Sequence, residues 1–254
     1  MTRRLLSRAL IATAAVVSLS GSAAAQPHVA GPPMPARATG TKAHWMLLGR
    51  SEQGRAILAV RVGNPKSPRV LVVGCIHGNE TAGIPIARAL EHVSTVDDVW
   101  IVPDLNPDGV AHGTRQDARG VDLNANFSSE WRGGGAPFDP YYGGPHPFSE
   151  RETRIARKLI EQIHPRLTIW YHQHMDVIWA YGQSTKAGRL YARATGMSLY
   201  HHHWLPGTAT NWQNHHLAGT SALTVELPAG VLSSAQVQRH VRAVLSVTKA
   251  LARP

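Results

Sequence analysis

Cysteine is nearly absent from this sequence of 254 residues, in which Cys75 is the only one. A single thiol excludes a disulfide within the chain, so the fold must be held by its hydrophobic core and by any metal ion that it binds. Cys75 itself lies in an apolar stretch, which is typical of an unreactive core residue and not of a nucleophile. The sequence also contains no internal repeat and no sign of a second domain.

A long hydrophobic segment is missing as well. The apolar run near the N-terminus, Ala9–Leu19, is much shorter than the roughly 20 residues that a membrane-spanning helix requires. Arginines precede this run and small residues, 23–25, follow it, so we predict that residues 1–25 are a secretory signal peptide cleaved before Gln26. No cysteine stands close behind the run, which argues against a lipoprotein anchor. The expected location is therefore secreted or in the cell envelope, without a stable membrane anchor.

Negative charge is scarce, with 16 Asp and Glu against 26 Lys and Arg and a formal net charge of +10. The positive residues are spread along the sequence, which does not favour nucleic-acid binding. Outside the cell, a basic protein is suited to residence near anionic envelope polymers. We expect a monomer with no nucleic-acid partner.

The remaining sequence has the pattern of one α/β domain. Residues 26–43 are rich in Pro, Gly and Ala and are predicted to be a flexible leader, and residues 44–254 are long enough for one domain with a full core. Apolar periodicity predicts strands at 55–63, 68–76, 99–106, 166–172 and 221–227, and helices at 81–93, 149–163, 184–195 and 234–251. Alternating strands and helices favour an α/β sandwich around a largely buried sheet.

Two segments carry further local signals. Ser149–Glu152 matches a capping box for the helix that ends near 163. Residues 107–144 hold many Gly, Pro, Asn and Asp residues and have almost no period. A loop this long inside a compact domain is usually functional.

His77 and Glu80 directly follow the apolar strand at 68–76, in the stretch GCIHGNETAG. In open α/β sheets ligands gather at the carboxyl ends of strands, and imidazole and carboxylate groups suit zinc. A third ligand is expected from another strand end, where His172 and His174 are both candidates because side chains two apart share a face. Chance also supplies His-x-x-Glu pairs, so this pair alone is a weak signal.

Glu226 lies near the end of the apolar strand at 221–227. A carboxylate is costly there unless it is functional or held in a structural ion pair. The segment at 207–220 precedes this strand and is predicted to line a substrate pocket, with Asn211, Gln213 and His215 as possible contacts.

Together these motifs resemble the zinc metallocarboxypeptidase family typified by carboxypeptidase A. The resemblance rests on His77-x-x-Glu80, NPDG at 106–109, GVDLNANF at 120–127, His172 and the VELP that holds Glu226, and it extends from about Trp45 to Leu251. Within the family the sequence is similar to the compact bacterial branch related to murein peptide amidase A, which trims cell-wall peptides. The resemblance implies a single-domain three-layer α/β/α sandwich with a mixed central sheet.

The resemblance also implies roles for single residues. His77, Glu80 and His172 would bind one zinc ion per chain. Glu226 would be the general base, taking a proton from the attacking water and delivering it to the leaving amine. Arg115 would polarise the scissile carbonyl, with Arg119 a less suitable candidate. Asn124 would hold the terminal carboxylate of the substrate.

One position departs from the family pattern. The family usually reads D-x-N-R-N and clamps the C-terminal carboxylate with that arginine, whereas this sequence has Ala125 there. Hydrolysis should survive the change, but ordinary C-terminal exopeptidase specificity is in doubt.

The leading hypothesis is an exported zinc peptidase acting on small peptides, with murein stem peptides and their γ-D-glutamyl–diaminopimelate bond as the expected substrate. One alternative is a deacylase similar to succinylglutamate desuccinylase and aspartoacylase, which share the His-x-x-Glu site. The other is a catalytically silent cell-wall-binding module, which Ala125 favours and the retained site residues disfavour.

Overall fold

The computed structural model describes residues 43–252, which fall within one unit, Arg37–Pro254. The predicted signal peptide at 1–25 and the predicted leader at 26–43 lie outside the described residues, apart from Ala43. Across residues 43–252, no helix combines the length and the apolar character needed to cross a membrane.

A mixed sheet of eight strands forms the centre of this unit, in the order β1-β2-β4-β3-β5-β8-β6-β7. The four middle strands, β4, β3, β5 and β8, run parallel to one another. The pairs β1–β2, β2–β4 and β6–β8 are antiparallel, and β6 and β7 are parallel. The strands are β1 (His44–Arg50), β2 (Ala56–Gly63), β3 (Arg69–Val73), β4 (Asp98–Val102), β5 (Leu167–Gln173), β6 (Val177–Trp179), β7 (Ser198–Tyr200) and β8 (Ser221–Leu227).

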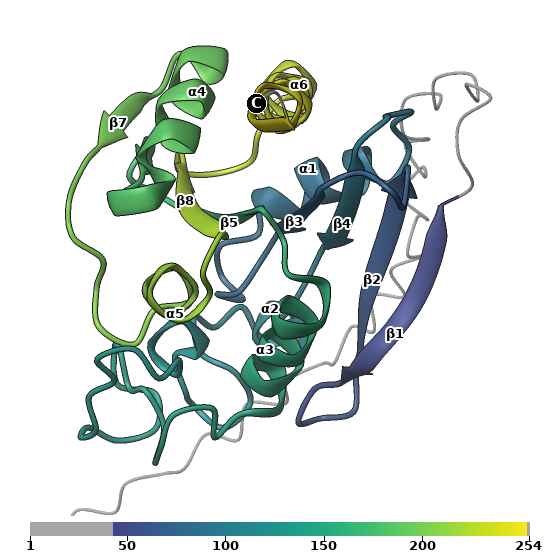
Figure 1. Ribbon diagram of the computed structural model, residues 1–254. Coiled ribbons are helices and arrows are strands. Elements are labelled where there is room, and N and C mark those ends of the chain that lie inside the picture. The colour runs from purple at the N-terminus through teal and green to yellow at the C-terminus, as the bar shows by residue number, and fades with distance from the viewer. Residues whose placement is uncertain (1–42, 253–254) are drawn as a thin grey trace, which may run out of the picture. The chain divides into compact units, whose positions relative to one another are not determined.

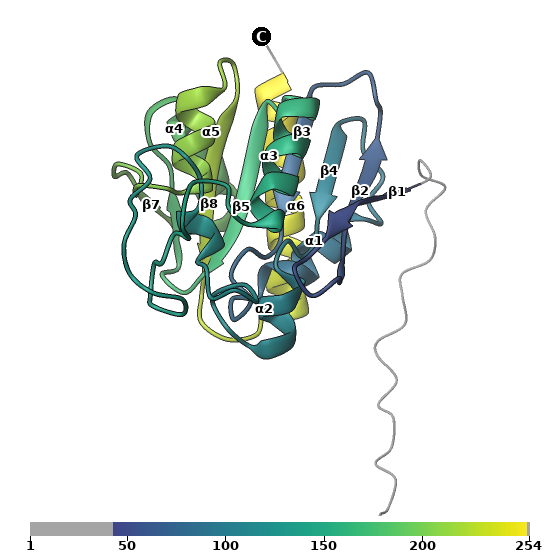
Figure 2. The same ribbon diagram turned by 90° about the horizontal axis from the view of Figure 1, so that it is seen from below.

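Helices cover both faces of the sheet, as Figures 1 and 2 show for α3 and α6, which lie on opposite sides of it. The helices α1 (Gly83–Leu90), α4 (Thr185–Thr195) and α6 (Ser234–Ala252) pack on one face, and α3 (Arg151–Ile163) and α5 (Ala209–His216) pack on the other. A short helix, α2 (Pro107–His112), follows β4. The predicted three-layer sandwich with a mixed central sheet is confirmed.

The burial of the central strands explains this arrangement. Every residue of β4 and all but the first residue of β3 are buried, and most of them are Val, Ile or Leu. Parallel strands of this composition are stable only with both faces covered, because each face would otherwise expose apolar side chains to water. Two clusters of buried residues, one on each face of the sheet, form the core.

The predicted strands and long helices are all present, with ends that differ by a few residues. The pattern missed β1, the three-residue strands β6 and β7, and the helices α2 and α5. The short strands have too few residues for a period, and β6 depends on pairing with β8. The helix α5 carries mostly polar residues, several of them buried, so no apolar stripe marked it.

The predicted capping box at Ser149–Glu152 is wrong. The residue that caps α3 is Glu150, and its side chain makes no capping hydrogen bond. The Ser149 hydroxyl instead donates to Glu150 Oε1 at 2.6 Å and accepts from the Asn126 amide. The Ser149 side chain, which the local pattern assigned to the start of α3, is thus bound to Asn126 of the long loop at 107–144 instead.

Candidate active site

The candidate residues lie at the carboxyl ends of adjacent parallel strands. His77 and Glu80 are in the loop that follows β3, His172 is in β5, and Glu226 is in β8. Because β3 pairs with β5 and β5 pairs with β8, all parallel, their carboxyl ends meet at one edge of the sheet.

The loop that carries His77 is held from below by the NPDG segment. The Asn106 side chain accepts from Gly109 N at 2.9 Å, which caps α2, and donates to the Ile76 carbonyl at 3.1 Å, which anchors the loop. One side chain thus ties the start of α2 to the loop that carries His77. The loop lies so close to α2 that a Cβ on Gly78 would come within 1.9 Å of the Gly109 backbone. Only glycine fits at position 78, which explains its place beside His77.

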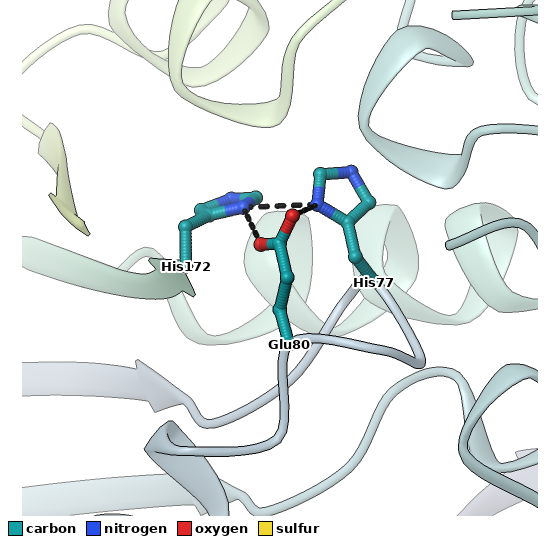
Figure 3. A group of neighbouring side chains, drawn as sticks. All are labelled: His77, Glu80 and His172. Atoms are coloured by element: carbon teal, nitrogen blue, oxygen red, sulfur yellow. Dashed lines mark hydrogen bonds and ion pairs between the residues drawn. The ribbon is translucent and has the colours of Figure 1, made fainter. Parts of the chain in front are cut away.

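His77, Glu80 and His172 point toward one another, with the carboxylate between the two imidazoles (Figure 3). His77 Nδ1 lies 2.9 Å from Glu80 Oε1, and His172 Nδ1 lies 3.0 Å from Glu80 Oε2. The two Nδ1 atoms are 3.1 Å apart. Among the described residues, this is the only group of three or more His, Cys, Asp or Glu residues whose ligand atoms all lie within 4.8 Å of one another. Two imidazole nitrogens and a carboxylate converging on one point fit a zinc ion with an open coordination position.

Asp122 orients this group from behind. It is buried, and its Oδ1 lies 2.9 Å from His77 Nε2, which leaves Nδ1 free to face Glu80 and His172. Its other oxygen accepts from Arg115 Nε at 3.0 Å. A carboxylate on the remote nitrogen of a ligating histidine fixes the ring and raises its basicity. No local sequence signal assigned this role to Asp122, although it stands in the GVDLNANF motif.

The electrostatics of His77, Glu80 and His172 favour the binding of a cation. Burial disfavours the charged form of His77, but the carboxylates of Asp122 and Glu80 outweigh it and raise the pKa of His77 to about 9. Burial acts to raise the pKa of Glu80, but hydrogen bonds from His172 and His77 lower it well below its ordinary value. A site that holds its carboxylate ionised and draws a proton to its histidine also suits a divalent cation.

Glu226 stands beside the group and is half-buried. It is paired in register with His172 across the β5–β8 ladder, so the two side chains lie on the same face of the sheet. Both line a cleft of about 480 Å³.

The same cleft receives the other predicted residues. Arg115 and Asn124 both line it, whereas Arg119 points to Glu150, with its Nε 3.6 Å from Oε2. His174 lines the cleft but is exposed and lies outside the three-residue group.

A match to a family model decides the classification. The model described as zinc carboxypeptidase matches residues 37–224, about three quarters of the sequence. The chain belongs to the zinc carboxypeptidase family. Glu226 lies two residues beyond the matched region, so its assignment rests on its position in β8.

Curated relatives of this zinc carboxypeptidase include carboxypeptidase B of Astacus astacus, 26% identical over 167 residues, which cover 53% of this chain and 55% of the relative. Metallocarboxypeptidase A of Trichophyton tonsurans is 27% identical over 179 residues, covering 56% of this chain and 42% of the relative. The chain spans about half the length of the curated relatives it matches, or less.

Solved structures share the fold. Carboxypeptidase A from Helicoverpa armigera superposes with a TM-score of 0.71 at 20% identity, covering 83% of this chain and 68% of that one. Murein-tripeptide amidase MpaA from Escherichia coli O157 superposes with a TM-score of 0.63 at 24% identity, covering 87% of this chain and 94% of that one. At these identities the likeness establishes the fold of the zinc carboxypeptidases.

The segment predicted to line the pocket at 207–220 is largely the helix α5, and only Thr208 and Thr210 of this segment line the cleft. Asn211 and Gln213 are fully buried instead. The structure adds Tyr141, whose ring lies 5.4 Å from the Arg115 guanidinium at the cleft. No sequence signal marked Tyr141, because it reaches the site from the long loop.

Proposed function

We propose that this chain is an exported zinc-dependent peptidase that hydrolyses an amide bond near the C-terminus of small peptides. The observation that carries the proposal is the position of Glu226, in register with His172 and on the same face of the sheet, in an open cleft beside the three candidate ligands. A structural ion pair would explain a strand-end carboxylate equally well, but Glu226 makes no ion pair among residues 43–252. Its exposure to the cleft supports a chemical role.

The residues divide the work of hydrolysis among them. His77, Glu80 and His172 would hold zinc, which when bound would act as a Lewis acid and lower the pKa of water so that it is a nucleophile at neutral pH. Glu226 accepts a proton from the attacking water and returns it to the leaving nitrogen, so one water is consumed for each amide bond cleaved. Asp122 keeps His77 in the tautomer that presents Nδ1.

Arg115 and Asn124 act on the substrate. The Arg115 guanidinium lines the cleft, where it stabilises negative charge that develops on the carbonyl oxygen. Asn124 is held by its Oδ1, which accepts from Ala209 N at 3.0 Å, and its Nδ2 lies 3.4 Å from His172 Nε2. The amide nitrogen can therefore donate to a bound peptide beside the metal ligands.

Murein stem peptides, cleaved at the γ-D-glutamyl–diaminopimelate bond, are the substrate that we propose. Two observations support this choice: the structural similarity to a murein-tripeptide amidase, and the predicted signal peptide, which would deliver the protein to the compartment that holds murein. Export is tested by determining the N-terminus of the protein from the extracytoplasmic fraction, which should be Gln26.

The test is incubation of the zinc-loaded protein with L-Ala-γ-D-Glu-meso-diaminopimelate, with mass spectrometry to follow diaminopimelate release. The wild type should release it, and Glu226→Gln should reduce kcat/KM by about 10²–10⁴-fold while still binding one zinc per chain, because only the base is lost. If the wild type releases no diaminopimelate, the proposal that murein stem peptides are the substrate is wrong. Turnover of acyl amino acids instead would identify a deacylase, and zinc binding without any turnover would identify a binding module.

A further inference from the structure

The walls of the cleft hold almost no free positive charge. Among the described residues that line it, Arg115 is the only lysine or arginine. Its Nη1 donates to Glu80 at 2.9 Å and its Nε donates to Asp122 at 3.0 Å, so two carboxylates already share this guanidinium. Glu226 adds a further negative charge to the wall.

Neutral donors occupy the cleft instead. Thr208, Thr210, Thr224 and Asn124 all belong to its lining, although the Thr208 hydroxyl already donates to the Leu205 carbonyl at 2.9 Å. Hydroxyl and amide groups can donate a hydrogen bond to a peptide carbonyl oxygen. Once this hydrogen bond is made, burying the carbonyl oxygen costs little free energy. A carboxylate bound away from the metal, with no cation of its own, pays a much larger desolvation cost, and Glu226 would repel it as well.

The cleft also has apolar lining residues. Its lining extends to Met175 and Leu205, whose side chains are half exposed, and to the stacked rings of Trp179 and Trp204. The volume of the cleft, about 480 Å³, is within the usual range of small-molecule binding sites, so a short peptide can occupy it. None of these apolar side chains requires the bound peptide to end beside the scissile bond.

We propose that this site does not recognise a free C-terminal carboxylate, and that it cleaves peptides in which the carboxyl group next to the scissile nitrogen is itself an amide. This inference rests on the proposed function and extends its substrate class from peptides with a free C-terminal carboxylate to peptides that are amidated or continue beyond the cleaved residue. The reaction is unchanged: one water is consumed, and an acid and an amine are formed.

The test compares matched pairs of peptides that differ in one group. The first pair is L-Ala-γ-D-Glu-meso-diaminopimelate and the same peptide amidated at the carboxyl group on the carbon that bears the scissile nitrogen. The second pair is hippuryl-phenylalanine and its amide. Wild-type protein should cleave the two members of a pair with kcat/KM values within about 5-fold. A preference of 100-fold or more for the free acid would overturn the proposal, because a site built around an ion pair rejects an analogue that lacks the charge.

Binding to zinc-loaded Glu226→Gln, measured by calorimetry without turnover, gives an upper limit for the preference for the acid, because this variant lacks the repulsion between Glu226 and a substrate carboxylate. If neither murein peptide is cleaved, the murein substrate fails, whereas the specificity is still read from the hippuryl pair. Equal affinities would support the inference and 100-fold tighter binding of the acid would overturn it.

Position 125, next to Asn124 in the short turn at Leu123–Ala125, offers a gain-of-charge control. Ala125→Arg should introduce a preference of at least 10-fold for the free acid. Ala125→Gln, of similar length but neutral, should not. A wild-type preference for the acid that Ala125→Arg leaves unchanged would overturn the proposal, since a carboxylate would then already be held by another group.

Discussion

Replacing Asp122 by asparagine should weaken zinc binding without unfolding the protein. The Asp122 carboxylate accepts hydrogen bonds from His77 Nε2 at 2.9 Å, Arg115 Nε at 3.0 Å and Asn124 N at 2.9 Å. An asparagine keeps the shape but loses the charge, and its amino group would face the N–H of Arg115 or of His77, donor against donor. His77 then becomes a less basic and less firmly oriented ligand.

The size of the effect follows from the position of Asp122 behind one of three ligands. Loss of such a partner typically costs 10- to 100-fold in metal affinity, which is about 1.4–2.7 kcal/mol. The effect should lie toward the upper end, because Asp122 is only 1% exposed and water cannot replace its carboxylate. Glu80 and His172 are untouched, so the protein should still bind one zinc at saturation.

The assay is competition for zinc with a chromogenic chelator, which yields the dissociation constant. Asp98→Asn is the matched control: Asp98 is also fully buried and accepts from an arginine, Arg61, at 2.7 Å, but it lies at the start of β4 and contacts no histidine. The control should bind zinc within 3-fold of the wild type. A dissociation constant for Asp122→Asn that is equally unchanged would refute the view that Asp122 tunes the site.

The remaining predictions concern the third ligand, the core and the ligand loop. His172→Ala should abolish zinc binding and His174→Ala should retain it, as metal analysis of the purified variants would reveal; the reverse result would make His174 the ligand. Burial lowers the pKa of His240 from 6.5 to about 4, so between these values the unfolded chain binds a proton that the folded chain does not. Stability should therefore fall as the pH drops from 6.5 to 4, by up to about 3 kcal/mol. His240→Gln should remove this part of the pH dependence in denaturant titrations, and an unaltered profile would contradict the assignment. Gly78→Ala should destabilise the protein by about 2 kcal/mol or more and lower zinc affinity, because its Cβ would collide with the Gly109 backbone; an unchanged melting temperature would show that the loop can move aside.

Strand-end positions were the most informative part of the sequence. His77, Glu80 and His172 could be picked out because each follows or ends an apolar strand, and parallel strands bring their carboxyl ends to one edge. The arrangement of Glu226 beside His172 follows from the same rule once β5 and β8 are known to be neighbours. The strand order itself was not readable from periodicity, which is a local property.

Other parts of the site came from contacts that no local pattern reports. Asp122 and Tyr141 belong to a long segment without a period, and they reach the site only because that segment folds back over the ends of the strands. The resemblance favoured Arg115 over Arg119, and tertiary contacts separate the two, directing one guanidinium to Glu80 and the other to Glu150.

The sequence by itself determined the class of fold and limited the candidate metal ligands to His77, Glu80 and either His172 or His174, since apolar strands and their ends can be recognised from neighbouring positions. The selection of His172 came from the resemblance to the zinc carboxypeptidases. The sequence also revealed Ala125 in place of the expected arginine. Only the tertiary structure decided that no other lysine or arginine among the described residues takes its place in the cleft, because a cation from any part of the chain could have done so. The charge of a binding site is a sum over residues that are distant in sequence, and folding alone brings them together.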